Sequence, residues 1–351
     1  MRRRFVGATL AAVFATSACA SAGGGPSADA RERVYVVSQD AATATVLDAR
    51  DGSVLATVDF EALGYGANAK PHHVVADPDG RHWYVSLIGA SRVVRLDEYD
   101  RVVDEAHFEA AGMLAIDPST DWMYVGRSMA AVDPPQRVGM IRRSAMALTE
   151  VDVLFNRPHA VAVAPRTGRV YVASLSEDRM AVSEEGSEDV TLYFMDGPIH
   201  TIVQFAISPD GRWLVGGGQM SGRLLVWDIS GDEPERFAAV ELGGQPWHPS
   251  FTPNGEVWVP NLTKNEVEVV DVSTWTVSET VKHPALVEPH GSAVSRDGRT
   301  VFVTGRNTSG AYGEGAPGTV VAIDAATKRV RWVAEVGPYA AGVAVGGGGP
   351  R

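Results

Sequence analysis

One short motif, an aromatic residue flanked by valine and other β-forming residues, recurs along this chain at nearly constant spacing. Its central positions are Tyr35, Tyr84, Tyr124, Tyr171, Leu214, Trp258 and Phe302, with leucine replacing the aromatic residue once. Successive positions are 49, 40, 47, 43, 44 and 44 residues apart. A period of this length is typical of four-stranded propeller blades, because each repeat must bury its apolar faces against its neighbours.

Each repeat has the same internal order. An apolar segment ends in a tight turn such as Asp77–Gly80, a second segment carries the aromatic residue, and a valine-rich third segment ends on aspartate. The aspartates are Asp48, Asp97, Asp228, Asp271 and Asp324. Pro-Asp-Gly and Asn-Gly turns join antiparallel strands, because glycine adopts positive φ without steric cost. No segment sustains an apolar period of 3.6 residues, so we expect little helix.

The two ends of the chain complete the count of strands. The first aromatic strand has no inner strand before it, whereas an apolar strand, 340–345, follows the last repeat. If this strand inserts ahead of residues 33–60, seven complete blades result and the ring has no open edge. The sequence therefore predicts an all-β, seven-bladed propeller forming a single domain over residues 33–346, with a short tail at 347–351.

The turn, the aromatic-valine strand and the aspartate-terminated strand together resemble the YVTN propeller repeats. That group is similar to bacterial surface-layer propellers and to the propellers of nitrite and nitrous oxide reductases. The resemblance covers nearly the whole chain after its N-terminal segment and implies the fold. It says little about activity, because propellers host unrelated functions.

The N-terminus has the pattern of an export signal. Three arginines, Arg2 to Arg4, precede a short apolar run and a zone of small residues, so residues 1–18 are predicted to be a signal peptide. Cys19 is the only cysteine, and its context resembles a lipobox, which implies lipidation and a flexible tether over residues 19–32. The alternative is ordinary cleavage near Ala18 or Ala20 and release. Either way the protein is expected outside the cytoplasm, in the periplasm or at the cell surface, and the lipid anchor would be its contact with a membrane.

The charge balance bears on partners. The chain has 43 acidic and 31 basic residues, and removing residues 1–18 takes away three of the arginines. An acidic surface repels nucleic acid, so we expect a small ligand or a protein partner instead.

Six of the nine histidines lie just before or at the start of predicted innermost strands. They are His72, His73, His159, His200, His248 and His290. Counting back from the turn, the first, third and last share one register, and His73 and His248 share the next. His200 lies three residues further upstream.

Propeller topology gives this pattern a meaning. The innermost strands begin at one mouth of the central channel, so we expect these imidazoles to converge there as a funnel. Two long connections, 174–189 and 305–318, are expected to overhang the same mouth. Secondary candidates for the funnel are Lys70, Arg157, Trp247 and Glu288.

Several occupants are compatible with clustered imidazoles. Nitrogen donors without sulfur suit copper, zinc or iron. The pair His72-His73 looks like part of the histidine ring that holds the copper cluster of nitrous oxide reductase, although two blades lack a histidine. Propellers that bind tetrapyrroles offer another resemblance, in which Arg157 and Lys70 would contact the macrocycle. In the structural alternative, each imidazole only hydrogen-bonds a neighbouring blade.

The sequence contains no recognisable nucleophile with its base. We therefore expect a binding or scaffold protein rather than an enzyme. A redox or cofactor-maturation protein carrying a metal or a tetrapyrrole is the first alternative. A lactonase-like hydrolase is the second.

Overall fold

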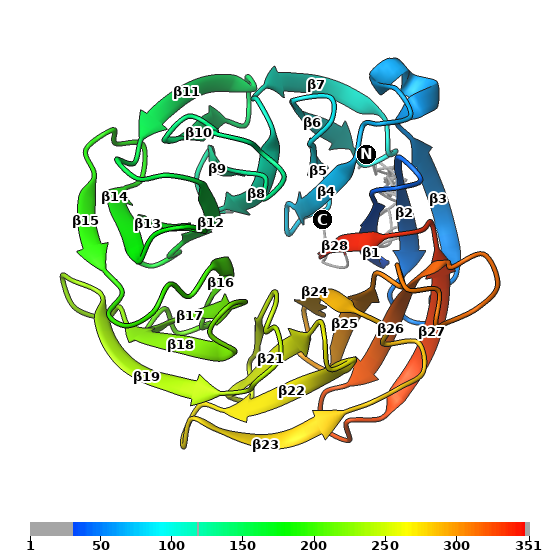
Figure 1. Ribbon diagram of the computed structural model, residues 1–351. Helices are drawn as coiled ribbons and strands as arrows, with labels where there is room; N and C mark the ends of the chain where they lie inside the picture. Colours follow the sequence, from blue (N-terminus) through cyan, green and yellow to red (C-terminus); the bar gives the residue numbers. More distant parts are fainter. Residues whose placement is uncertain (1–30, 118, 348–351) are drawn as a thin grey trace, which may run out of the picture.

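The computed structural model describes residues 31–117 and 119–347. The predicted signal peptide, Cys19, nearly all of the tether and the tail beyond Gly347 lie outside these residues. Seven four-stranded antiparallel sheets are arranged around one axis (Figure 1). The prediction of an all-β, seven-bladed propeller is confirmed.

Each blade contributes one strand to each of four concentric positions. The inner strands are β28 (Ala340–Gly347), β4 (Pro71–Ala76), β8 (Ala111–Ile116), β12 (Pro158–Val163), β16 (Ile202–Ile207), β20 (Ser250–Thr252) and β24 (Pro289–Val294). The second strands are β1 (Glu32–Ser38), β5 (His82–Leu87), β9 (Trp122–Arg127), β13 (Arg169–Ser174), β17 (Trp213–Gly218), β21 (Glu256–Asn261) and β25 (Thr300–Gly305). The third strands are β2 (Thr43–Asp48), β6 (Arg92–Asp97), β10 (Arg137–Arg142), β14 (Arg179–Glu184), β18 (Arg223–Asp228), β22 (Glu266–Asp271) and β26 (Gly318–Asp324). The outer strands are β3 (Val54–Asp59), β7 (Val102–His107), β11 (Ala147–Asp152), β15 (Thr191–Phe194), β19 (Glu235–Glu241), β23 (Thr276–Val281) and β27 (Val330–Val336). We number the blades from the one that holds β1, so that blade 2 begins at β4 and blade 7 at β24.

The C-terminal strand closes the ring. In blade 1, β28 pairs antiparallel with β1, with Tyr35 opposite Ala344 and Val34 opposite Val345. The first and last segments of the described chain therefore form one sheet, as predicted from the unpaired strand at the end of the sequence. In the described chain, the second strand of every blade therefore pairs with an inner strand.

The aspartates that end the third strands are turn residues. In all five, the carboxylate accepts a hydrogen bond from the backbone N–H two residues further on. An aspartate that bonds its own backbone in this way stabilises the turn leading to the outer strand. This repeated feature is structural rather than functional.

The hydrophobic core lies between adjacent blades. The second-strand residues of the repeat motif are buried, and Tyr35, for example, packs with Val74 and Trp83 of the next blade. Trp258 packs in the same way with Val301 and Val303 of blade 7. The repeated aromatic residues therefore join the blades to one another.

Of the two long connections predicted from the sequence, one is interrupted by a strand and the other is present. Residues 174–189 are not one long loop, because β14 passes through them as the third strand of blade 4. The connection from β25 to β26 is long, as expected.

The one helical element among the described residues is a single π-turn, η1 (Glu61–Tyr65). In the part of the chain that the structure describes, no helix is both long and apolar enough to cross a bilayer.

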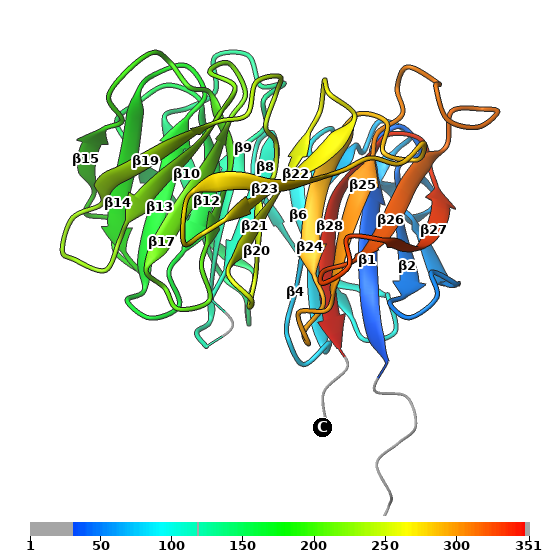
Figure 2. The ribbon, with the colours of Figure 1, turned by 90° about the horizontal axis from the view of Figure 1, so that it is seen from below.

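The ring has two distinct faces (Figure 2). The described chain begins and ends on one of them, where β1 starts and β28 stops. All inner strands start on the opposite face, which also carries the connection from β25 to β26. We call this opposite face the loop face.

Candidate ligand site in the central channel

A repeated backbone conformation sets the start of each inner strand. In six blades, the residue just before the strand has a left-handed conformation, with φ between 49° and 58°. These residues are Lys70, Ala110, Arg157, Thr201, Glu288 and Tyr339. The carbonyl of each accepts a hydrogen bond from an N–H just beyond the second strand of its blade. In blade 6 the carbonyl of Gln245 has this role, accepting from Leu262.

This hydrogen bond gives the true structural register of the seven blades. We define the first ring position as the residue two after the accepting carbonyl, and the second ring position as the next one. The first ring position holds His72, Gly112, His159, Val203, Trp247, His290 and Ala341. The second holds His73, Met113, Ala160, Gln204, His248, Gly291 and Gly342.

Five imidazoles from four blades lie together near the axis. The ring centroids of His248 and His290 are 4.5 Å apart, and those of His72 and His290 are 5.8 Å apart. His73 lies 5.9 Å from His248, and His159 lies 6.4 Å from His72. The indole of Trp247 packs against His248 and His290. We call these five histidines and Trp247 the imidazole cluster.

His200 does not belong to this cluster. It precedes the left-handed Thr201, and its Nε2 lies 3.3 Å from the carbonyl of Asp196. The residue of blade 5 that occupies the second ring position is instead Gln204. Sequence reasoning missed Gln204 because it looked for histidine. Its place three residues after Thr201, like that of His73 after Lys70, marks it as the equivalent residue.

The imidazole cluster is not an open funnel. Its six side chains are each between 1% and 8% exposed, so the loop-face end of the channel is filled by rings. Burial lowers the pKa of His159 to about 4 and that of His73 to about 3. It also holds the pKa values of His72, His248 and His290 well below the ordinary value of 6.5. All five rings are therefore neutral at neutral pH.

Neighbouring backbone groups fix which nitrogen carries the proton in two of the rings. His159 Nδ1 lies 2.5 Å from the carbonyl of Arg127, which can only accept, so Nδ1 is protonated and Nε2 keeps a free lone pair. His73 Nδ1 accepts the backbone N–H of Leu114 at 3.2 Å, so its proton is on Nε2. The two imidazoles thus present opposite hydrogen-bonding characters, an acceptor at His159 and a donor at His73.

Four buried ring nitrogens in the cluster have no hydrogen-bond partner among the described residues. They are His72 Nε2, His159 Nε2, Trp247 Nε1 and His290 Nδ1. All four belong to the first ring position, and each comes from a different blade. An unpaired buried polar group costs about 1–3 kcal/mol, so four of them around one axis require an explanation.

Arg127, at the end of β9, holds His159 in place. Its guanidinium is buried and donates to the carbonyls of Glu109 and Arg137 and to the carboxylate of Glu150. The neighbouring Gly126 lets β9 approach the backbone of His159 closely, because a Cβ at this position would lie 2.0 Å from the carbonyl oxygen of His159. Neither residue was a candidate from sequence, because their roles depend on the adjacent blade.

The secondary candidates have mixed positions. Lys70 is exposed, and Arg157 is half-buried and donates to the carbonyl of Met129 at 2.6 Å. The carboxylate of Glu288 accepts hydrogen bonds from the backbone N–H and hydroxyl of Thr308. These three are the left-handed residues that start their inner strands. Of the four candidates, Trp247 alone belongs to the imidazole cluster.

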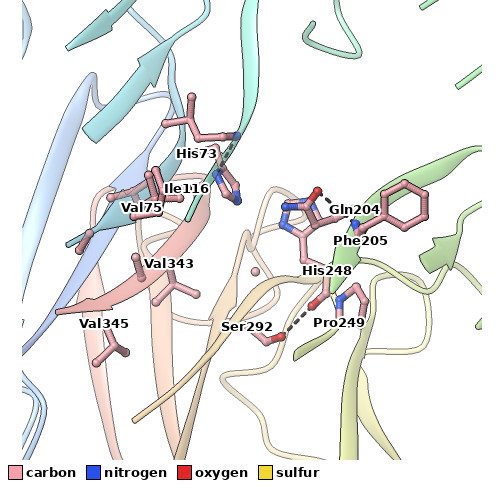
Figure 3. A pocket seen from close by; sticks show the side chains of 15 residues that line it. His73, Val75, Ile116, Gln204, Phe205, His248, Pro249, Ser292, Val343 and Val345 are labelled. Atoms are coloured by element: carbon pink, nitrogen blue, oxygen red, sulfur yellow. Dashed lines mark hydrogen bonds between the residues drawn. The ribbon is translucent and has the colours of Figure 1, made fainter. Parts of the chain in front are cut away.

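A cavity of about 300 Å³ lies in the channel next to the cluster (Figure 3). His73, Gln204 and His248 line it, together with apolar residues from further along the inner strands. Among residues 31–117 and 119–347, no three His, Cys, Asp or Glu side chains are arranged to hold a metal ion as they stand.

Comparison with known proteins supports the fold. No family model and no curated protein sequence matches the chain. Among solved structures, apo AztD from Citrobacter koseri superposes with a TM-score of 0.64 at 13% identity, covering 92% of this chain and 99% of AztD. The dihydro-heme d1 dehydrogenase NirN in complex with DHE gives 0.60 at 16%, covering 90% and 75%. The hydrazine synthase of Kuenenia stuttgartiensis gives 0.59 at 17%, covering 72% and 76%. At these identities the likeness shows the propeller fold alone.

Proposed function

We propose that the protein is an exported, lipid-anchored propeller that binds a small ligand or a protein partner through the histidine end of its central channel. The observation that carries this proposal is the set of four buried, unpartnered ring nitrogens at the first ring position. A fold that only needed packing there could use apolar residues, as it does at Val203 and Ala341, without the cost of unpaired nitrogens. Polar side chains from four blades are better accounted for by a bound species.

The protein without its signal peptide and Cys19, residues 20–351, tests this proposal. It is purified without a chelator or a histidine tag, and bound species are identified by native mass spectrometry, metal analysis and absorption spectroscopy. We expect a bound species that is lost in His72→Ala and His290→Ala and retained in His107→Ala, because His107 is exposed on β7. A bound species that all three variants retain would place binding elsewhere.

A metal ion is the second candidate, and one observation favours it. The backbone carbonyl of Arg127 accepts from Nδ1 of His159 and leaves Nε2 free, which is the usual orientation of metal-ligating histidines. His72, whose ring centroid lies 6.4 Å from that of His159, and His290, 5.8 Å from His72, would add further nitrogen donors, and such a donor set suits copper, zinc or iron. Because no three ligands of the described chain are in position, binding would need rotation of at least one ring. Stoichiometric metal in the same purified protein would decide for this candidate.

A tetrapyrrole remains an alternative for the same end of the channel, with Arg157 and Lys70 as its basic contacts. The solved structure of NirN in complex with DHE shows that a propeller of this fold class can be found with such a ligand. The absorption spectrum of the purified protein distinguishes this case from a colourless ligand or a bound partner.

Export and anchoring are further parts of the proposal, supported by the arginine-rich N-terminus and by Cys19. We also place the repeats with the YVTN propellers on the motifs described above. Cys19→Ser tests the anchor: the variant should move from the membrane fraction to the soluble exported fraction, whereas unchanged membrane association would contradict lipidation.

A further inference from the structure

The cavity in the channel is asymmetric along the axis. At its end nearest the imidazole cluster it is lined by polar side chains, His73, Gln204, His248 and Ser292. Further along the inner strands its walls are aliphatic and include Val75, Ile116, Val343 and Val345 (Figure 3). The cavity is therefore amphipathic, with a polar end and an apolar body.

The polar end presents hydrogen-bond donors. His73 uses Nδ1 to accept from Leu114, so the nitrogen left for the cavity is the protonated Nε2. Gln204 uses Oε1 to accept the backbone N–H of Phe205 at 3.1 Å, so its remaining polar group is the NH₂. Ser292 donates its hydroxyl hydrogen towards the carbonyl of His248 or the hydroxyl of Ser250. Among the described residues, these two donors, from two blades, thus have no acceptor.

The charge of the lining limits the ligand further. No Asp, Glu, Lys or Arg of the described chain lines the cavity. A carboxylate placed there would lose its hydration without gaining a cation, which is costly. A neutral oxygen acceptor avoids this cost and matches the donor character of His73 and Gln204. The volume of about 300 Å³ equals that of the smallest ordinary ligand pockets.

We infer that this cavity binds a small, neutral, aliphatic carbonyl compound, such as a ketone or an ester, with its oxygen between His73 and Gln204 and its hydrocarbon chain along the valine-lined wall. The inference rests on the proposed function in that it takes the central channel as the binding site, and it deepens that proposal by naming a ligand class. The donors that the inference invokes, on His73 and Gln204, belong to the second ring position, whereas the four unpartnered ring nitrogens belong to the first.

Three probes of similar size but different head groups test the inference: pentyl methyl ketone, hexanoate and hexylamine. Binding to the protein without its signal peptide is measured by calorimetry and by changes in NMR methyl signals at pH 8. We expect the ketone to bind at least tenfold more tightly than hexanoate or hexylamine. Equal affinity for the three probes, or no binding of the ketone, would overturn the inference.

Two variants locate the site. Gln204→Glu keeps the oxygen that accepts from Phe205 and replaces the donor NH₂ by an acceptor, so ketone affinity should fall at least tenfold. Gln136→Glu, the same change at an exposed position, is its control. Val345→Phe should fill the apolar end and abolish binding, whereas Val103→Phe on the exposed face of β7 should not. Circular dichroism verifies that each variant is folded, and unchanged ketone affinity in folded Gln204→Glu would also overturn the inference.

The two proposals fail separately. Ketone binding that needs Gln204, in a protein whose other bound species does not depend on His72 or His290, would refute the function proposed for the imidazole cluster and leave this inference standing. If the protein instead holds a bound species that depends on His72 and His290 but does not bind the ketone, this inference is refuted and the function proposed for the imidazole cluster stands.

Discussion

The five buried imidazoles should make the stability of this propeller depend steeply on pH. Their pKa values in the folded protein lie below 6.5, at about 4 for His159 and about 3 for His73, because burial disfavours the charged ring. Below pH 6.5 the unfolded chain therefore binds protons that the folded chain does not. Stability that is fully present above pH 6.5 is lost as pH falls from 6.5 towards those folded-state values.

The magnitude follows from the shifts. One pH unit corresponds to about 1.4 kcal/mol for each such group, so at pH 5.5 His73 and His159 together should remove about 3 kcal/mol relative to pH 8. If all five rings in the cluster remain neutral, the loss approaches about 7 kcal/mol. A domain is commonly stable by about 5–15 kcal/mol, so the effect should be large.

Urea unfolding followed by tryptophan fluorescence, between pH 8 and pH 5.5, measures this dependence. His159→Phe should reduce the slope of unfolding free energy against pH by about 1.4 kcal/mol per unit, the contribution of one proton. His107→Phe, which removes an exposed imidazole from β7, is the matched control. The reasoning is refuted if wild-type stability is flat over this range, or if both variants change the slope equally.

Three further predictions concern the packing of the blades and the closure of the propeller. Trp258→Ala should lower the unfolding free energy by about 3–5 kcal/mol in urea titrations, because Trp258 is fully buried between blades 6 and 7. Gly126→Ala should lower the unfolding free energy by about 1–3 kcal/mol, because the new Cβ would lie 2.0 Å from the carbonyl oxygen of His159. Gly231→Ala, whose new Cβ has its nearest neighbour 4.0 Å away, should leave the unfolding free energy unchanged in the same titration. Deleting residues 340–351 should give aggregates in size-exclusion chromatography, because β1 then exposes an unpaired edge. A soluble, cooperatively folding truncation would show that ring closure is dispensable.

Much of the fold follows from local patterns in the sequence. The aromatic motif predicts the second strands, the turn residues predict where each strand ends, and the unpaired strand near Ala340 predicts how the ring closes. These predictions succeed because strand alternation, turn geometry and repeat length are properties of short segments. The loop predicted over residues 174–189 was wrong, since its many polar residues concealed the third strand of blade 4.

The chemical character of the channel was decided by tertiary structure. Sequence reasoning could align His72 with His159 and His290, but it placed His200 with them and overlooked Gln204. It could not show that the rings close the end of the channel, or that a cavity lies beside them. Nor could it assign the protons of His73 and His159, because those depend on a backbone N–H and a carbonyl that belong to the adjacent blade in each case. A residue's own sequence context sets its position on the strand, whereas the groups it meets across the blade boundary are set by the twist and closure of the whole ring.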